Sequence, residues 1–329
     1  MGEPNNVLKV YMKRPDRIRS VLEYYLGEEL PQDWAVEAAD GFYTLINSKG
    51  KISFRERDNI SRIWADGYSF CLGLENQDAI NLIYPWRVME LDCCAYGTEI
   101  EEIQERNVQV KVVYGAEDDF KYRYKKEDKL EPILTLTLYW GRKKWEKPLA
   151  LKDMVDMEKI PGKLQKHFAD YKVDIIHMRS IPEEDLQKMD SDLKYVLGIM
   201  KCTNSRKKYA EYIRKNKDYF SKIPRSAVDV INVCTNIKNI TKYLQYTTTQ
   251  EDEEETADMC KALVEIERNA IRKGHKQGVK EGVKEGQKQG IQQGIQLAQL
   301  LLADGRQEDL LRSATDALFR KKLLKEYRI

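Results

Sequence analysis

An Asp66-Gly67 pair between two β-rich runs is the feature that most constrains the fold of this chain. Asp-Gly in such a setting is the strongest short-range signal for a β-hairpin. We therefore predict a hairpin within Phe54–Gln77, with its turn at Ala65-Asp66-Gly67 and with Asp58 in its first strand. The second strand continues into Glu75, which is about as far from the turn as Asp58 is, so the two carboxylates should meet across the ladder.

Three polar side chains should gather at the open end of this hairpin. Side chains at positions i and i+2 share one face of a strand, so Glu75 and Gln77 point together while Asn76 points the opposite way. Two close carboxylates repel each other unless a cation lies between them, and hard oxygen ligands suit Mg²⁺ or Mn²⁺. The pattern therefore indicates either a magnesium-type site at Asp58 and Glu75 or a solvated sheet edge that carries two acids by chance.

Charge and cysteine content narrow the class of protein. The 329 residues include 56 basic and 54 acidic side chains, a formal net charge of +2, so only local basic patches are available to bind nucleic acid. Six cysteines without CxxC spacing argue against a zinc site or a disulfide framework. The sequence contains no long apolar run and no nucleophile-elbow, P-loop or dinucleotide motif. We expect a cytoplasmic protein that does not enter a membrane.

Hydrophobic periodicity predicts helices on both sides of the hairpin. Apolar residues at three- and four-residue intervals indicate a helix over Asp16–Leu26. Glu23 lies on or beside its apolar stripe, as either an extra carboxylate for the metal site or a half-exposed boundary residue. A second helix over 84–103 places Arg87 in its first turn. A cation gains nothing from the helix dipole there, so Arg87 should bind an anion, either a substrate phosphate or a carboxylate in a structural pair.

The remaining segments complete a mixed sheet covered by helices, an α/β fold class. The near-continuous apolar run of Ile133–Trp140 is typical of a central strand buried on both faces. The basic cluster Arg142-Lys143-Lys144 follows it, and either contacts a phosphate backbone or forms a solvated turn. We also predict irregular chain over 28–41, strands over Phe42–Asn47, Val108–Tyr114 and Asp174–Met178, and helices over Glu183–Met200, Arg206–Phe220 and Arg225–Asn236.

The acidic run Glu251–Glu255 opens a segment of different character. From Asp258 the pattern is helical, with a glycine at every fourth position from Gly274 to Gly294 among Lys, Gln and Glu. Each glycine costs a helix about 1 kcal/mol relative to alanine. We interpret this tract as a semi-flexible helical spacer or a weak self-association segment. Helices at Leu297–Leu302 and Leu310–Leu324 cap it and offer an apolar face to a partner or another subunit.

Several motifs occur in one order along nearly the whole chain. They are RERD at Arg55–Asp58, LGLENQ at Leu72–Gln77, YPWRVMELD at Tyr84–Asp92, LTLTLYWG at Leu134–Gly141, VINVCTN at Val230–Asn236, and the Gly-periodic tail. With these motifs the chain resembles the PD-(D/E)XK nuclease superfamily, and more closely the bacterial Rpn family of recombination-promoting nucleases, also described as transposases. The resemblance implies a restriction-endonuclease-like αβββαβ core with a mixed sheet over 1–180, a helical annex over 181–250, and a charged Gly-periodic helical tail with a terminal cap over 251–329.

The resemblance also implies roles for single residues. Asp58 and Glu75 correspond to the metal-binding carboxylates, and the backbone carbonyl of Asn76 to a further ligand. Gln77 stands where many members of the superfamily carry a lysine, although related Rpn-like proteins also carry glutamine. An amide can orient the attacking water but supplies no positive charge, so slow activity is expected. The chain departs from the family pattern at Tyr84, where a methionine is usual.

The sequence is compatible with three functions. The leading hypothesis is a Mg²⁺- or Mn²⁺-dependent DNA endonuclease of recombination or transposition, with Asp58, Glu75 and Gln77 as catalytic residues and Arg87 in contact with DNA. The first alternative is a catalytically weak or inactive protein of the same fold that binds DNA or another protein, which the near-neutral charge and the missing lysine favour. The second alternative is an assembly scaffold that forms homo-oligomers through its C-terminal helices.

Overall fold

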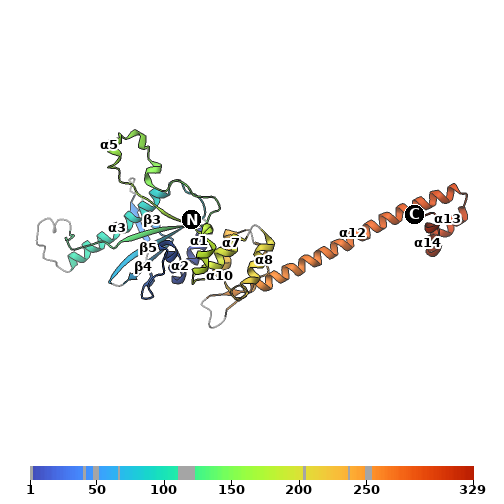
Figure 1. The fold of residues 1–329 in the computed structure, drawn as a ribbon, viewed down its shortest axis with the longest axis horizontal. Helices are drawn as coiled ribbons and strands as arrows, with labels where there is room; N and C mark the ends of the chain where they lie inside the picture. Colours follow the sequence, from blue (N-terminus) through green and yellow to red (C-terminus); the bar gives the residue numbers. More distant parts are fainter. Residues whose placement is uncertain are drawn as a thin grey trace. The chain divides into compact units, whose positions relative to one another are not determined.

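The computed structural model of the protein describes residues 3–39, 42–46, 52–65, 67–109, 123–202, 205–235, 238–248 and 254–329. The chain forms two compact units, Met1–Ala262 and Leu263–Ile329 (Figure 1). Among the described residues, no helix combines the length and the apolar character that crossing a bilayer requires.

A five-stranded mixed sheet forms the centre of the first unit. It consists of β1 (Ala35–Ala38), β4 (Asn59–Ala65), β5 (Tyr68–Gln77), β6 (Ile133–Tyr139) and β7 (Asp174–His177), in the spatial order β1-β4-β5-β6-β7. The pairs β1–β4 and β4–β5 are antiparallel, whereas β5–β6 and β6–β7 are parallel. The predicted α/β class with a mixed sheet is therefore confirmed, and β5 is its central strand.

The predicted hairpin is formed by β4 and β5. Its register runs from Ala65 opposite Tyr68, beside the turn, to Asn59 opposite Leu74 at the open end. Gly67 adopts a φ of 80°, a left-handed conformation that glycine reaches without steric cost. Asp58 directly precedes β4 rather than lying inside it, because the ladder begins one residue later, and its side chain is buried.

Three strand predictions need correction. Residues 28–41 are not wholly irregular, because β1 pairs with β4 at the sheet edge, a long-range contact that local pattern does not encode. Residues 108–109 belong to helix α3 (Tyr84–Gln109) rather than to a strand, and 110–114 lie outside the described residues. β6 is next to the edge rather than central, because only β7 lies beyond it.

Two small sheets accompany the main one. The predicted strand near Phe42 is β2 (Phe42–Ile46), which pairs antiparallel with β3 (Ile52–Glu56) as a separate ribbon. The other small sheet has the order β8-β10-β9 and joins distant parts of the chain: β8 (Ile223–Pro224), β9 (Tyr246–Thr247) and β10 (Thr256–Ala257).

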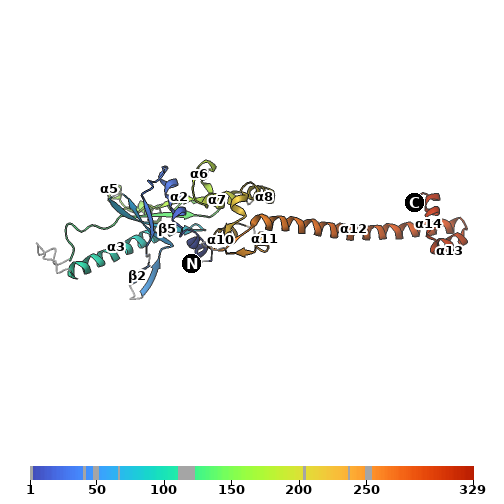
Figure 2. The ribbon, with the colours of Figure 1, turned by 90° about the horizontal axis from the view of Figure 1, so that it is seen from below.

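Helices cover both faces of the main sheet. On one face lies α1 (Glu3–Tyr11), where the Asn59 amide donates a 2.9 Å hydrogen bond to the carbonyl of Lys9. On the other face lies α3, where the Tyr84 hydroxyl accepts a 3.0 Å hydrogen bond from Thr137 of β6. The predicted helix near Asp16 is α2 (Pro15–Leu26), and α1 also packs against α10 (Arg225–Cys234), beside which it lies in Figure 2.

The helices after the sheet pack tightly against the N-terminal helices. The guanidinium of Arg17, only 1% exposed, donates two hydrogen bonds of 2.7 and 2.9 Å to the carboxylate of Asp192. The predicted helix over 183–200 is broken, because Met189 adopts an extended conformation and the chain becomes helical again only at Leu193, directly after Asp192. The predicted boundary at residue 180 falls inside the first unit. Besides α10, the helices and 3₁₀ turns described between residues 151 and 241 are η1 (Leu151–Met154), η2 (Met157–Lys159), α5 (Gly162–Gln165), η3 (Met178–Ser180), α6 (Glu183–Lys188), α7 (Leu193–Lys201), α8 (Arg206–Lys215), α9 (Lys217–Phe220) and α11 (Lys238–Thr241).

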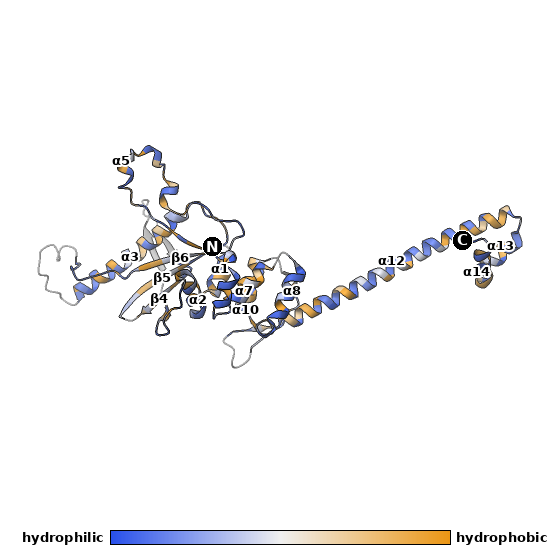
Figure 3. Ribbon diagram, in the orientation of Figure 1, coloured by the Kyte–Doolittle hydropathy of each residue, from blue (hydrophilic) through white to orange (hydrophobic). Residues whose placement is uncertain are grey.

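The Gly-periodic tract is part of α12 (Met259–Ala303), a helix of 45 residues. A methyl group added at any glycine from Gly274 to Gly294 would have no neighbour within 4 Å outside the helix. Figure 3 shows that polar residues dominate this part of α12. At its end Leu297, Leu301 and Leu323 form the small core of the second unit, with α13 (Gln307–Thr315) and α14 (Ala317–Glu326).

Candidate active site

Asp58 and Glu75 meet at the open end of the hairpin. The backbone N–H of Asn76, next to Glu75 on β5, donates a 2.7 Å hydrogen bond to Oδ2 of Asp58. The ladder register continues this pairing, since Asn59 lies opposite Leu74 and Asp58 precedes Asn59 by one residue. The hairpin thus brings together the two carboxylates that the sequence singled out.

The Glu75 carboxylate is buried in an environment that disfavours its charge. The residue is 1% exposed, and within the described part of the chain neither of its oxygens accepts a hydrogen bond. Burial, and then the charge of Asp58, raise the pKa of Glu75 to about 8, although Arg57 and Arg87 oppose the shift. The backbone N–H of Asp58 also acts on this carboxylate, but its geometry falls short of a hydrogen bond. A buried carboxylate whose oxygens accept no hydrogen bond is the kind of group that a hard cation satisfies.

A buried ion pair holds the residue that precedes Asp58. Arg57, the preceding residue, pairs with Asp92 of α3 and donates a 2.7 Å hydrogen bond to Thr135 of β6. Thr135 and Tyr171 also donate hydrogen bonds to Asp92. Removing one partner of such a buried pair leaves the other charge without compensation, which is strongly destabilising. The pair therefore holds Arg57, and with it the backbone just before Asp58, in one position.

Gly73 makes room for this ion pair. A Cβ atom built at Gly73 of β5 would lie 2.4 Å from Nη1 of Arg57, which is closer than real atoms approach. The guanidinium therefore lies directly over the backbone of the central strand, on the face that Glu75 shares with Gly73.

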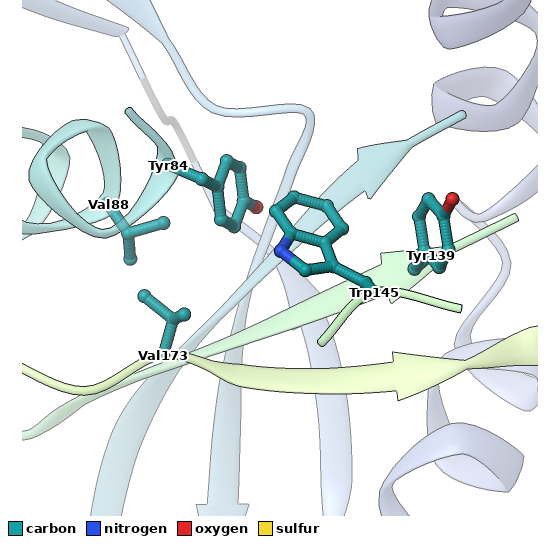
Figure 4. Close-up of a cluster of buried hydrophobic side chains, with 5 residues drawn as sticks. All are labelled: Tyr84, Val88, Tyr139, Trp145 and Val173. Carbon is teal, nitrogen blue, oxygen red and sulfur yellow. The ribbon is translucent and has the colours of Figure 1, made fainter. Parts of the chain in front are cut away.

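An aromatic cluster closes the Glu75 side of the sheet. Trp145 lies between Tyr84 and Tyr139 and packs edge-on against both, at ring-centroid distances of 5.1 and 5.2 Å (Figure 4). Val88 and Val173 complete the cluster. Burial, and then the charge of Glu75, raise the pKa of Tyr84 well above its ordinary value, so this phenol stays neutral.

The two residues after Glu75 face opposite sides. The side chain of Asn76 turns away, accepts a 3.0 Å hydrogen bond from the indole of Trp140, and donates one of 3.3 Å to Asn59. A strand residue directs its N–H and C=O to the same side, so the Asn76 carbonyl points toward the side of Asp58. Gln77 is buried on the face of Glu75, and its backbone carbonyl accepts a 2.8 Å hydrogen bond from Trp140.

Arg87 and Glu23, the other two candidates, have different surroundings. Arg87 is half-buried near enough to Glu75 to lower its pKa, and within the described residues its side chain forms no hydrogen bond or ion pair. Glu23 instead pairs with Arg19 at 2.9 Å and accepts a 3.2 Å hydrogen bond from the N–H of Leu30. The structure therefore places Arg87 with the two acids, and it engages Glu23 within the α2 region.

The sequence did not indicate the ion pair of Arg57 with Asp92 or the place of Tyr84 in the aromatic cluster. Asp92 follows Val88 by four residues on the buried face of α3, so helical spacing alone could have marked it as a buried acid in need of a cation. Across the described ranges, no three His, Cys, Asp or Glu side chains come together as metal ligands. A cation here would have two carboxylates and a backbone carbonyl from the chain, which suits Mg²⁺ because it keeps several waters.

Comparison with known proteins identifies part of the chain. Residues 113–230 match the family model described as "Putative transposase, YhgA-like". This segment includes β6, β7 and the helices from α6 to α9, whereas Asp58 and Glu75 lie before it. Neither the curated proteins nor the solved structures contain a significant match to the chain. The predicted family resemblance is therefore confirmed over residues 113–230, which are similar to the YhgA-like transposase family, the Rpn group that the sequence motifs indicated.

Proposed function

We propose that this protein is a divalent-metal-dependent endonuclease that hydrolyses phosphodiester bonds of DNA. The observation that carries the proposal is the position of Asp58 beside the buried Glu75. The two carboxylate oxygens of Glu75 accept no hydrogen bond from the described residues. Two neighbouring buried carboxylates are unfavourable when both are ionised, and a cation bound between them would stabilise their negative charges. The match to a transposase family supports DNA as the substrate, because transposition requires DNA strands to be cut.

The order of elements supports a restriction-endonuclease-like core. The succession α2, β1, β4, β5, α3, β6 is an αβββαβ arrangement, with the ribbon of β2 and β3 inserted after its first strand. In this arrangement both acids lie at the end of the sheet where the carboxyl ends of the parallel strands β5 and β6 lie side by side. Because fold alone does not establish activity, the proposal depends on the acids rather than on the topology.

Asp58, Glu75 and the Asn76 carbonyl would hold the metal, with Mg²⁺ as the expected ion and Mn²⁺ as a substitute. A bound metal of this kind supplies an activated water and stabilises charge on the leaving oxygen. Arg87, which has no partner among the described residues, binds the substrate phosphate. Gln77 orients water through its amide, while the pair of Arg57 and Asp92 holds the site rigid.

A nicking assay tests the proposal. Purified protein and Mg²⁺ should convert supercoiled plasmid to the open circular form, and EDTA should stop the reaction. The near-isosteric variants Asp58→Asn and Glu75→Gln should lose at least about a hundredfold in rate, the scale of losing a principal electrostatic contribution. The exposed-acid variant Glu211→Gln on α8 is the matched control and should retain full activity. Equal nicking by all four proteins would refute the assignment.

One observation favours a second candidate, a protein that binds DNA without cutting it. Asp58 and Glu75 are 3% and 1% exposed, and position 77 supplies no ammonium group. Calorimetric titration with Mn²⁺ separates the two candidates. The nuclease should bind the ion, and Glu75→Gln should abolish binding, whereas a purely DNA-binding protein would show no heat of Mn²⁺ binding in either form.

A further inference from the structure

The segment directly after β6 concentrates positive charge on the surface. Arg142, Lys143 and Lys144 are consecutive and exposed, and Lys147 follows them. The whole chain has a formal net charge of only +2, so a run of this kind is a local feature rather than a sample of a basic surface. The two readings left open by the sequence are a solvated turn and a phosphate contact.

The topology places this segment at the edge of the sheet that carries the candidate active site. β5, β6 and β7 are parallel, with Gln77 opposite Tyr139 and Tyr139 opposite His177. The carboxyl ends of the three strands therefore meet at one edge. Arg142 follows Tyr139 by three residues, and Glu75 precedes Gln77 by two, so the cationic segment leaves the sheet beside the acids.

Buried aromatic packing fixes the segment in place. Trp145 is 2% exposed, packs between Tyr84 and Tyr139 in Figure 4, and donates a 3.3 Å hydrogen bond to the carbonyl of Pro148. At the other end, a Cβ atom built at Gly141 would lie 2.2 Å from the Tyr139 hydroxyl oxygen, so the backbone passes directly against that ring. A solvated turn needs neither anchor, whereas a binding element gains from being held before its ligand arrives.

The charges around the segment leave its first two residues uncompensated. Arg142 lies close enough to the guanidinium of Arg179 to add to the lowering of the pKa of Arg179, which burial dominates. Arg179 is held by a 2.7 Å hydrogen bond to the carbonyl of Trp140. Within the described residues, Arg142 and Lys143 form no ion pair.

The acids nearby act on other residues. Glu146 pairs with Lys144 at 3.2 Å, but both side chains are largely exposed, so this contact is weak. Asp153 pairs with Lys147, and the charge of Asp78 acts on Tyr139. Lys144 also lines a groove of about 560 Å³ along the edge strand β7, together with Tyr25 and His177. Basic side chains beside a groove with aromatic residues are a combination that proteins use to bind single-stranded nucleic acid.

We propose that Arg142, Lys143 and Lys144 bind the sugar-phosphate backbone of the DNA strand that enters the candidate active site. This inference rests on the proposed function for its choice of DNA. The segment contributes positioning charge and no chemistry: it holds the flanking phosphates while Arg87 faces the phosphate at the acids.

The test is a binding measurement that needs no catalysis. Fluorescence anisotropy in EDTA compares the wild-type protein with Arg142→Gln/Lys143→Gln/Lys144→Gln, using duplex and single-stranded oligonucleotides of one sequence at several salt concentrations. The chain provides a matched control, because the same Arg-Lys-Lys triplet occurs at 206–208, exposed in the first turn of α8. The control variant is Arg206→Gln/Lys207→Gln/Lys208→Gln.

Substitution of the triplet at 142–144 should weaken DNA binding, whereas substitution of the triplet at 206–208 should leave DNA binding unchanged. Each phosphate contact contributes about 0.9 to the slope of log K against log salt for duplex DNA, so the first variant should flatten the slope by up to about 2.7 and weaken binding at least about tenfold. The strand that loses more affinity, duplex or single, identifies the form bound. Equal losses in both variants, or no loss in the first, would overturn the inference.

Failure of the proposed function would look different. If the wild-type protein binds DNA in EDTA through residues 142–144 yet never nicks plasmid, the inference stands and the nuclease assignment fails. If the wild-type protein nicks plasmid and the variant at 142–144 binds and nicks equally well, the nuclease assignment stands and the inference fails.

Discussion

At the scale of single residues, Glu75 is the central residue of the candidate active site. It is a buried acid with Asp58 as its neighbour and two guanidiniums, Arg57 and Arg87, acting on it at longer range. Burial dominates, so the folded protein holds a proton on Glu75 at pH values where an unfolded chain has released it. This difference in proton binding connects the stability of the metal-free protein to pH.

The metal-free protein should lose stability as pH rises. The pKa of Glu75 lies near 8 in the folded state, against an ordinary value near 4.5, so the folded state binds more protons between these limits. Its free energy of unfolding should therefore fall by a few kcal/mol from about pH 5 to pH 8, since each pKa unit corresponds to about 1.4 kcal/mol. Thermal unfolding in EDTA at pH 5, 6.5 and 8 measures this, and Glu75→Gln should flatten the dependence.

Glu131 offers a control of opposite sign. Although burial raises the pKa of Glu131, hydrogen bonds from Ser69 at 2.6 Å and from Arg62 outweigh it and lower the pKa below its ordinary value. Its contribution to stability is therefore present above the ordinary pKa and is lost in acid. Glu131→Gln should destabilise the protein at pH 6.5 and 8 alike. A wild-type profile that does not fall with pH would contradict the burial of an ionisable Glu75.

At the scale of elements, strand β5 and helix α3 hold the site between them. The Arg57 guanidinium lies over Gly73 of β5 and pairs with Asp92 of α3, so strand, loop and helix share one buried contact. Such a contact tolerates no additional atom on the strand, because the guanidinium is fixed by Asp92 and by Thr135 and cannot turn aside cheaply.

Two glycine-to-alanine variants should therefore differ in sign. Gly73→Ala should destabilise the protein by about 1–3 kcal/mol through overpacking. Gly97→Ala, on the exposed side of α3 with no neighbour within 4 Å of the added methyl group, should stabilise it by up to about 1 kcal/mol. Urea unfolding gives both values. Equal effects of the two substitutions would mean that Arg57 does not lie over Gly73.

At the scale of the whole molecule, the first unit ends later than composition suggests. The predicted tail begins at Glu251, yet β10 lies between β8 and β9, and the backbone N–H of Arg225 donates a 2.8 Å hydrogen bond to the carbonyl of Glu255. Met259 and Ala262 are buried as well. The acidic run marks a change in composition but not the end of the packed core.

Truncation should reveal this difference. A chain ending at residue 270 keeps β10 and Met259, so its melting temperature in the first unit should match that of the full chain. A chain ending at residue 250 loses both, and it should be destabilised by several kcal/mol, since removing one buried large apolar side chain alone costs about 2–5 kcal/mol. Calorimetry on both chains measures the effect. Equal stability would place the domain boundary at 250.

The sequence by itself determined the local parts of this protein. The Asp66-Gly67 pair and the alternation around it determined the hairpin and its register, because a two-residue turn permits few pairings. That register in turn brought Asp58 and Glu75 together. Gly27 ends α2 with a φ of 76°, and the apolar run of β6 formed its strand, because these choices depend on neighbouring residues in the chain.

Only the tertiary structure decided the contacts that join distant segments. Residues 35–38 are a strand because β4 offers an open edge, and Asp192, between the two helices that replace the predicted helix over 183–200, pairs with Arg17 of α2. Likewise, the pairing of Arg57 with Asp92 depends on how α3 packs on the sheet, and no described residue forms a hydrogen bond to the Glu75 oxygens. Local propensity differs by only about 1 kcal/mol between states, and burial and ion pairing at long range outweigh it.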